Sequence, residues 1–444
     1  MSKSTALLVL LAAWSILTMS GAAETEPAAG PSGAAKARPD LRPTPAQLKV
    51  AKIRELKGRH LTLYTDLPAG PGVDSLPDAF DQAFDQWLAY FHIEITKSSA
   101  PIVACLMREK PRFAAVGLLP ADLPAFDHAY FRGNRIWVFD QKDDYYRRHL
   151  LLHEGTHAFM NTNLGACGPP WFMEGIAELL ATHALVDGQV ALNQFPADAE
   201  DVPGWGRVRL VRDALAAGRR MPIDDILTYD ARAHEEVEPY GWCWAIAAFL
   251  DGHPRYQERF RELARHPDPK DFNDRFRKAF DADWRELAEE WQLFVAHLEY
   301  GYDLVREAIN FRPGKPLPAA GAKVKVAADR GWQAAGVTLE AGKTYHLRAT
   351  GRFQVAADPR PWPSGPEGVT IRYWERKPLG ILLAAVHPEP FDPDSASTLL
   401  SPLAIGAEGT IRPEATGTLY LRINDSPAEL DDNKGSLDVQ IRPE

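Results

Sequence analysis

Hydrophobic and polar positions follow two different patterns along the chain. Up to about residue 311 apolar residues recur mainly at helical spacing, and beyond residue 324 they alternate in short runs. The first pattern predicts an α+β domain at 47–311 with a mostly helical second half. Strands are expected at 61–65, 102–107 and 134–139, and helices at 78–91, 143–161, 171–183, 207–217, 240–251, 254–265, 271–280 and 283–307.

The second pattern predicts an all-β sandwich of the jelly-roll-like kind at 324–444. Gly, Pro and Asp turns separate its β-type runs, which are GVTLEAG, TYHLRATG, VTIRYW, GTLYLRIN and SLDVQI. The segment 312–323 is rich in Pro, Gly and Ala, and this composition is typical of a linker. The fold class expected is therefore α+β followed by β.

The N-terminal residues 1–23 are typical of a signal peptide. Lys3 is followed by an apolar run from Ala6 to Leu17 and then by small residues at 20–23. We expect export to the periplasm, the cell surface or the medium, with an uncleaved anchor as the alternative. The Ala, Pro and Gly content of 24–46 predicts a flexible leader. No later stretch is long enough to span a membrane.

Charge and cysteine content exclude some classes of function. The net charge of −10 argues against binding to nucleic acid. The three cysteines, Cys105, Cys167 and Cys243, allow at most one disulfide and exclude a disulfide scaffold. Their wide spacing also argues against a cysteine zinc site.

Candidate chemistry begins with the motif HEGTH. Its histidines, His153 and His157, are four residues apart, so on a helix both imidazoles face the same side and can reach one cation. Glu154 follows the first histidine and can act as a general base toward a water molecule at the metal. A surface helix that happens to carry two histidines is the structural alternative.

A second acidic helix follows after a Gly/Pro-rich break, in the sequence PPWFMEGIAELLATH. Its glutamates, Glu174 and Glu178, are one turn apart on the same face. Glu174 is far enough along the chain for its carboxylate to return to a metal on the preceding helix. Taken alone, two exposed glutamates on a surface helix would be the simpler interpretation.

Together these two segments resemble the gluzincin metallopeptidases, the aminopeptidase-like and peptidase-MA-like families. The resemblance covers roughly residues 130–300 and implies a zincin-like fold with a peptide or protein substrate. It implies zinc bound by His153, His157 and Glu174, with Glu154 as the base. Glu178 matches an acidic position that orients a ligand histidine in some relatives.

A further match is PYGWCWAIAAFL, because related enzymes carry a Pro-Tyr at the start of a helix at this distance. The resemblance implies that the Tyr240 hydroxyl stabilises the oxyanion, with a core tyrosine as the alternative. The segment that binds a free amino terminus in aminopeptidases is missing, so an aminopeptidase specificity is unsupported. The strand at 134–139 is expected to be the sheet edge to which an extended peptide adds. His149 is expected either at the surface or next to the zinc ligands, without binding the ion itself.

The end of the β-region, residues 417–441, resembles the PA-IL-type galactophilic calcium lectins. The resemblance implies calcium bound by the side chains of Asp425, Asp432 and Asn433 and by the backbone carbonyl of Glu429. The residues that complete a galactose site have no counterpart, so calcium is expected and the sugar is open. An acidic turn without an ion is the alternative.

These observations predict an exported zinc peptidase held near its substrate by a calcium-dependent glycan-binding domain. The competing interpretation is a catalytically inert glycan-binding or envelope protein that keeps a zincin-like fold. The presence of Glu154 argues against it, because an inert protein would more often have lost the base.

Overall fold

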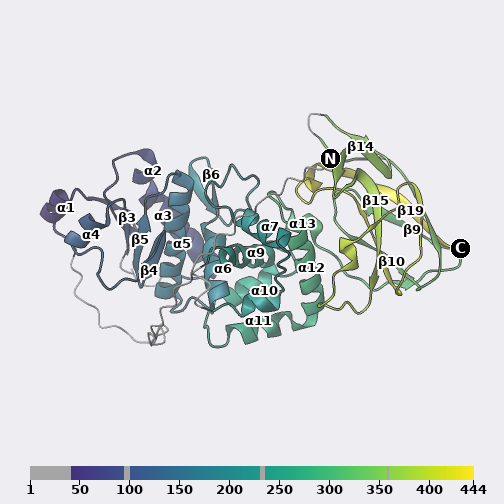
Figure 1. The fold of residues 1–444 in the computed structure, drawn as a ribbon, viewed down its shortest axis with the longest axis horizontal. Helices are drawn as coiled ribbons and strands as arrows, with labels where there is room; N and C mark the ends of the chain where they lie inside the picture. Colours follow the sequence, from purple (N-terminus) through teal and green to yellow (C-terminus); the bar gives the residue numbers. More distant parts are fainter. Residues whose placement is uncertain (1–41, 95–100, 231–235, 358–359) are drawn as a thin grey trace, which may run out of the picture. The chain divides into compact units, whose positions relative to one another are not determined.

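A computed structural model describes residues 42–94, 101–230, 236–357 and 360–444. The predicted signal peptide and nearly all of the predicted leader lie outside these residues; α1 (Pro45–Ala51) begins at the end of that leader. Within the described ranges, no helix has the length and apolar character needed to cross a bilayer. The chain combines helices and sheets, which confirms the mixed α and β class (Figure 1).

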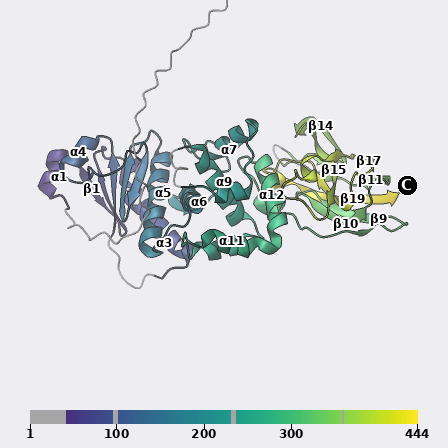
Figure 2. The ribbon, with the colours of Figure 1, turned by 60° about the horizontal axis from the view of Figure 1, so that its bottom comes forward.

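A five-stranded sheet forms the N-terminal part (Figure 2). Its order is β1 (Arg54–Lys57), β2 (Leu61–Thr65), β3 (Ile102–Met107), β5 (Arg135–Phe139) and β4 (Ala129–Arg132). The three expected strands are confirmed as the parallel strands β2, β3 and β5. The expectation that the strand at 134–139 forms the edge is wrong, because β5 pairs with β3 on one side and with β4 on the other.

Alternation along these strands sends side chains to two different cores. Leu63, Ala104 and Ile136 pack in the main core with α3 (Leu76–Phe91) and α5 (Asp144–Asn163). Tyr64, Cys105 and Trp137 pack on the opposite face in a smaller cluster, which includes residues of α1 and α4 (Lys110–Ala115). The sheet is therefore covered on both faces, and α5 lies on the face with the larger core.

The second half of this region is helical, as expected. After α6 (Pro170–Ala181) and the hairpin of β6 (His183–Val186) and β7 (Gln189–Leu192), helices follow one another to residue 307. The single helix expected at 283–307 is wrong: α12 ends at Ala296, Gly301 adopts a positive φ of 79°, and Asp303 caps a new short helix. The described helices are α7 (Arg207–Ala216), α8 (Ile223–Leu227), α9 (Glu238–Gly252), α10 (Gln257–Ala264), α11 (Phe272–Phe280), α12 (Trp284–Ala296) and α13 (Leu304–Glu307).

Two six-stranded sheets make up the C-terminal part. One has the order β14-β15-β18-β10-β8 with β16 beside β15, and the other has the order β13-β12-β19-β11-β17 with β9 beside β19. Their facing residues share one core. The strands are β8 (Lys315–Pro316), β9 (Ala322–Ala327), β10 (Gln333–Leu339), β11 (Tyr345–Thr350), β12 (Phe353–Gln354), β13 (Pro363–Ser364), β14 (Glu367–Trp374), β15 (Lys377–Pro388), β16 (Leu403–Ala404), β17 (Glu408–Ile411), β18 (Gly417–Ile423) and β19 (Lys434–Pro443).

The segment expected to be a linker takes part in this structure. Lys315–Pro316 forms β8, which pairs in parallel with β10, and β9 begins at Ala322. Residues Pro43–Glu444 form one compact unit. Within the segment that composition predicts as a linker, residues 315–316 pair with β10 and residues 322–323 pair with β19.

Strands β15 and β18 are buried on both of their faces. On one face Leu382 and Leu421 enter the core between the two sheets. On the other face Leu383 and Tyr420 pack in a cluster with Leu293 of α12. This double burial explains the nearly continuous apolar sequence of β15, which lacks the alternation that marks a strand with one wet face.

Polar groups also join the two regions. The buried Glu289 of α12 lies 2.7 Å from His387 Nε2 on β15 and accepts a hydrogen bond of 2.5 Å from Ser397 Oγ. The buried Arg422 of β18 donates to Glu307 at 3.0 Å. Buried charges of this kind are stable only while their partners are in place. The β-region is thus fixed against the helical region by a buried, mixed interface.

Close helix packing beside the candidate site depends on a glycine. A Cβ at Gly175 of α6 would lie 2.6 Å from the carbonyl oxygen of Cys243 on α9. We expect Gly175→Ala to lower the free energy of unfolding by about 1–3 kcal/mol, because backbone atoms cannot move aside cheaply. Thermal and urea unfolding would measure this. Gly70→Ala is the control, since its Cβ meets nothing within 4 Å; equal stability of the two variants would contradict the packing argument.

The interface makes a second prediction. Glu289→Ala removes the carboxylate that His387 and Ser397 share, and we expect a loss of about 3–5 kcal/mol in the free energy of unfolding. Arg285→Ala on the same helix is the control, because Arg285 is exposed, and should change stability by less than about 0.5 kcal/mol. A Glu289→Ala protein as stable as the control would show that the two regions do not depend on this contact.

Candidate metal centre

Helix α5 carries both motif histidines into the interior. His153 and His157 are 5% and 2% exposed, and their Nε2 atoms lie 3.2 Å apart. Successive turns of one helix place them on the same face, as the spacing predicts. The ring of Phe131, on the edge strand β4, stacks on the His157 ring with 4.8 Å between centroids. The sheet edge therefore reaches the histidine pair through β4.

Helix α6 brings Glu174 to the same point. Its Oε2 lies 3.1 Å from His153 Nε2 and 3.6 Å from His157 Nε2. Ligand atoms about 2.0–2.1 Å from a tetrahedral zinc ion are about 3.3 Å from one another. The three protein atoms thus already have the mutual spacing of three corners of such a site. Their chemistry, two imidazoles and one carboxylate, is that of a catalytic zinc centre with a fourth position for water.

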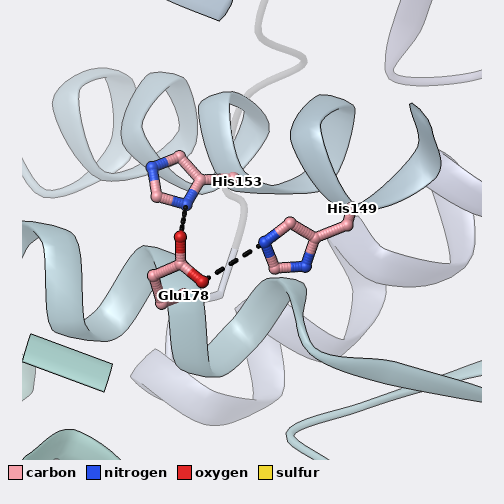
Figure 3. Close-up of side chains that lie close together, drawn as sticks. All are labelled: His149, His153 and Glu178. Atoms are coloured by element: carbon pink, nitrogen blue, oxygen red, sulfur yellow. Dashed lines mark ion pairs between the residues drawn. The ribbon is translucent and has the colours of Figure 1, made fainter. Parts of the chain in front are cut away.

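Behind the histidines lies Glu178, one turn after Glu174. Its Oε1 is 3.4 Å from His153 Nδ1 and its Oε2 is 3.3 Å from His149 Nε2, as Figure 3 shows. His149, His153 and Glu178 could also form a metal-binding group by distance. However, Arg207 occupies the same carboxylate at 2.7 Å, so Glu178 is better suited to orient His153 than to bind an ion.

Negative charge is concentrated in this cluster. Glu154, Glu174 and Glu178 are all less than 9% exposed, and the guanidinium of Arg207 donates to Glu178. Burial lowers the pKa of His149, so that ring is neutral. Burial acts to lower the pKa of His153, but the Glu174 and Glu178 carboxylates raise that pKa well above its usual range, so His153 can carry balancing positive charge. A divalent cation at the Glu174 carboxylate would supply that charge instead, because buried carboxylates are stable only with a positive partner.

Burial and neighbours separate the pKa values of the three carboxyl groups. Burial raises the pKa of Glu154. Burial also acts to raise the pKa of Glu174, but the neighbouring His157 and His153 outweigh it and lower that pKa. Burial acts to raise the pKa of Glu178 as well, but the Arg207 guanidinium outweighs it and holds that pKa well below its usual range. The carboxyl groups of Glu174 and Glu178 are therefore anionic, whereas that of Glu154 has the greater proton affinity that a base requires.

Tyr240 lies in the first turn of α9, with its ring 6.2 Å from the His153 ring. Burial raises its pKa, and the nearby Glu174 and Glu154 carboxylates raise it further. The phenol therefore keeps its proton and can donate a hydrogen bond at this position. The structure brings together the residues that the sequence predicted for zinc chemistry. It places His149 behind the histidine pair, which is one of the two positions expected for it, and not at the surface. It adds Arg207 and Trp205, for which the sequence offered no comparable signal.

Two of the residues predicted to bind calcium, Asp425 and Asn433, are in direct contact. Asp425 is fully buried; its Oδ2 accepts a hydrogen bond of 2.8 Å from Asn433 Nδ2, and burial raises its pKa to about 7. Buried side-chain oxygens without a hydrogen-bond partner are found here among the described residues: Oδ1 of Asn424, of Asp432 and of Asn433. The Glu429 side chain pairs with Arg372, which leaves its backbone carbonyl for the predicted role. Unsatisfied oxygens beside a buried carboxyl suit a hard cation.

This acidic loop contacts the helical region. Ser426 Oγ donates to Glu299 at 2.5 Å, and the backbone N–H of Asp303 donates to the carbonyl of Pro427 at 3.0 Å. The loop is thus part of the interface between the two regions.

Comparisons with known proteins find weak likenesses. No protein-family model matches the chain, and no curated protein matches it either. Among solved structures, the "EclA N-terminal domain; PllA-like lectin" is 23% identical, with a TM-score of 0.22, over 28% of this chain and 95% of that chain. An aminopeptidase N family protein from Idiomarina loihiensis is 10% identical, with a TM-score of 0.29, over 87% of this chain and 68% of that chain. Neither likeness assigns this chain to a family.

Proposed function

We propose that this protein is a zinc metallopeptidase with a zincin-like catalytic region, which binds zinc through His153, His157 and Glu174. The observation that carries the proposal is the mutual spacing of 3.1–3.6 Å among the three buried ligand atoms. Zinc supplies Lewis acidity toward the scissile carbonyl and lowers the pKa of water.

The chain's own groups fit the remaining steps of peptide hydrolysis. Glu154 takes the proton of the attacking water and later delivers it to the leaving amine. The Tyr240 hydroxyl donates a hydrogen bond to the carbonyl oxygen as that oxygen gains negative charge. The edge strand β4, beside His157, offers main-chain groups to an extended peptide.

For the β-region we propose a jelly-roll-like sandwich that binds calcium through Asp425, Asp432, Asn433 and the carbonyl of Glu429. The buried, unpartnered oxygens there support an ion. In our proposal Asn424 adds a further oxygen. Glycan binding in this region is part of the proposal and rests on the lectin resemblance of residues 417–441.

We further propose that residues 1–23 direct export, so the enzyme acts outside the cytoplasm on peptides or proteins.

Zinc content and casein hydrolysis test the enzyme proposal. We expect one zinc per wild-type chain by metal analysis. Glu154→Gln should keep that zinc but lose about 10²–10⁴-fold in cleavage rate, because the base is gone and the ligands remain. His157→Ala should lose the metal itself. Glu200→Gln, an exposed position, is the control and should match wild type. Stoichiometric zinc without Glu154-dependent cleavage would favour the inert alternative.

Thermal unfolding tests the calcium proposal. Millimolar calcium should raise the unfolding midpoint of the full chain, because an ion that binds only the folded state stabilises it. Asp425→Asn should abolish this rise, whereas the exposed Asp394→Asn should retain it. An unchanged unfolding midpoint of the wild-type chain in calcium would contradict the proposed calcium site. A glycan array with and without calcium then tests sugar binding. Glycan binding that is equal in the two conditions would show that the sugar does not bind at the calcium site.

A further inference from the structure

The Glu178 carboxylate, which lies behind the proposed ligands, is held by two side chains from a single tripeptide. Its Oε1 accepts a hydrogen bond from Arg207 Nη2 at 2.7 Å, and its Oε2 accepts one from Trp205 Nε1 at 3.3 Å. Each oxygen also faces one histidine of α5: Oε1 faces His153 and Oε2 faces His149. We call the segment 205–207 the Glu178 clamp.

Local geometry explains how neighbours in sequence reach the same carboxylate. Gly206 adopts φ 63°, a left-handed conformation that a residue with a side chain rarely takes, and it caps α7. Arg207 also donates from Nη1 to the backbone carbonyl of Trp205 at 2.8 Å, which closes the segment on itself. The guanidinium is therefore anchored by the Trp205 carbonyl as well as by Glu178.

The clamp also contacts the helix that carries the proposed oxyanion donor. The Arg207 guanidinium lies 5.7 Å from the centre of the Tyr240 ring. The Trp205 ring packs edge-on against Trp244 of the same helix, with 4.7 Å between centroids. Arg207 thus touches, with one group, both the carboxylate behind His153 and the ring of Tyr240.

We propose that Arg207 is a positioning residue of the metal centre, acting through Glu178 on His153 and by direct contact on Tyr240; this inference rests on the proposed zinc function. Arg207 holds Glu178 Oε1 with Nη2 while its Nη1 is anchored on the Trp205 carbonyl, and the Trp205 indole holds Oε2, so the carboxylate is fixed at both oxygens. The oriented carboxylate, 3.4 Å from His153 Nδ1, is placed to accept the proton there and so to direct the Nε2 lone pair toward the ion. Without Arg207 the carboxylate can rotate, and His153 loses its fixed tautomer and ring orientation.

Zinc affinity of the full chain, measured by chelator competition, tests this role. Arg207→Met should weaken zinc binding by about 10–100-fold, as removal of groups behind metal ligands usually does. Arg207→Lys keeps the charge but not the planar group that joins Glu178 to the Trp205 carbonyl, so it should recover part of that loss. Visible absorption of the cobalt-loaded protein should change in Arg207→Met, because the coordination geometry around the ion changes.

Arg422→Met is the matched control, because it also breaks a buried Arg–Glu pair but lies in the β-region. It should lower stability and leave zinc affinity and the cobalt spectrum unchanged. Unchanged zinc affinity in a folded Arg207→Met protein, or equal weakening in Arg422→Met, would overturn the inference.

If Arg207→Met does not fold, Trp205→Phe decides, since it removes a single donor to Glu178 and should weaken zinc binding by up to about 10-fold. An unchanged cobalt spectrum and zinc affinity in that variant would then count against the clamp. Absence of zinc from the wild-type protein is a different result, because it overturns the proposed function itself.

Discussion

The rest of the candidate site depends on how the protein tolerates buried negative charge. Glu154, Glu174 and Glu178 are withdrawn from water within one small region, and such groups are stable there only with cations and hydrogen-bond donors beside them. Arg207 satisfies this requirement for Glu178. The two histidines and Glu174 are arranged for a cation to satisfy it at the other carboxylates. Stability of the fold and binding of a metal ion therefore both require positive charge beside these carboxylates.

Much of this arrangement could be predicted because it follows from short-range rules. The spacing of His153 and His157 determines that they share a helix face, and Glu178 follows Glu174 by one turn for the same reason. The distance between Glu174 and the histidines along the chain allows α6 to return to α5, and the family resemblance predicts that it does. Arg207 could not have been predicted, because its contact joins residues 29 positions apart and no local periodicity marks it. The left-handed Gly206 is visible only in the folded backbone.

The errors in the predicted fold also have physical causes. One edge of the first sheet is the four-residue strand β4, which is too short to show a pattern, whereas β5, which the sequence predicts as the edge, lies inside the sheet. Strand β15 was missed because both of its faces are buried, which removes the alternation that reveals a strand. The linker composition of 312–323 carries no signal for the pairing of β8 with β10.

Double burial of β15 and β18 has a consequence for how this molecule could arise or be re-engineered. A carbohydrate-binding module joined by a free tether can be exchanged between enzymes, because its surface is complete by itself. Here Leu383 and Tyr420, together with the charge of Arg422, would meet water if the chain were divided near residue 312. Such fragments would carry an apolar, aggregation-prone patch. Recombination of either half would therefore have to bring a complementary surface with it.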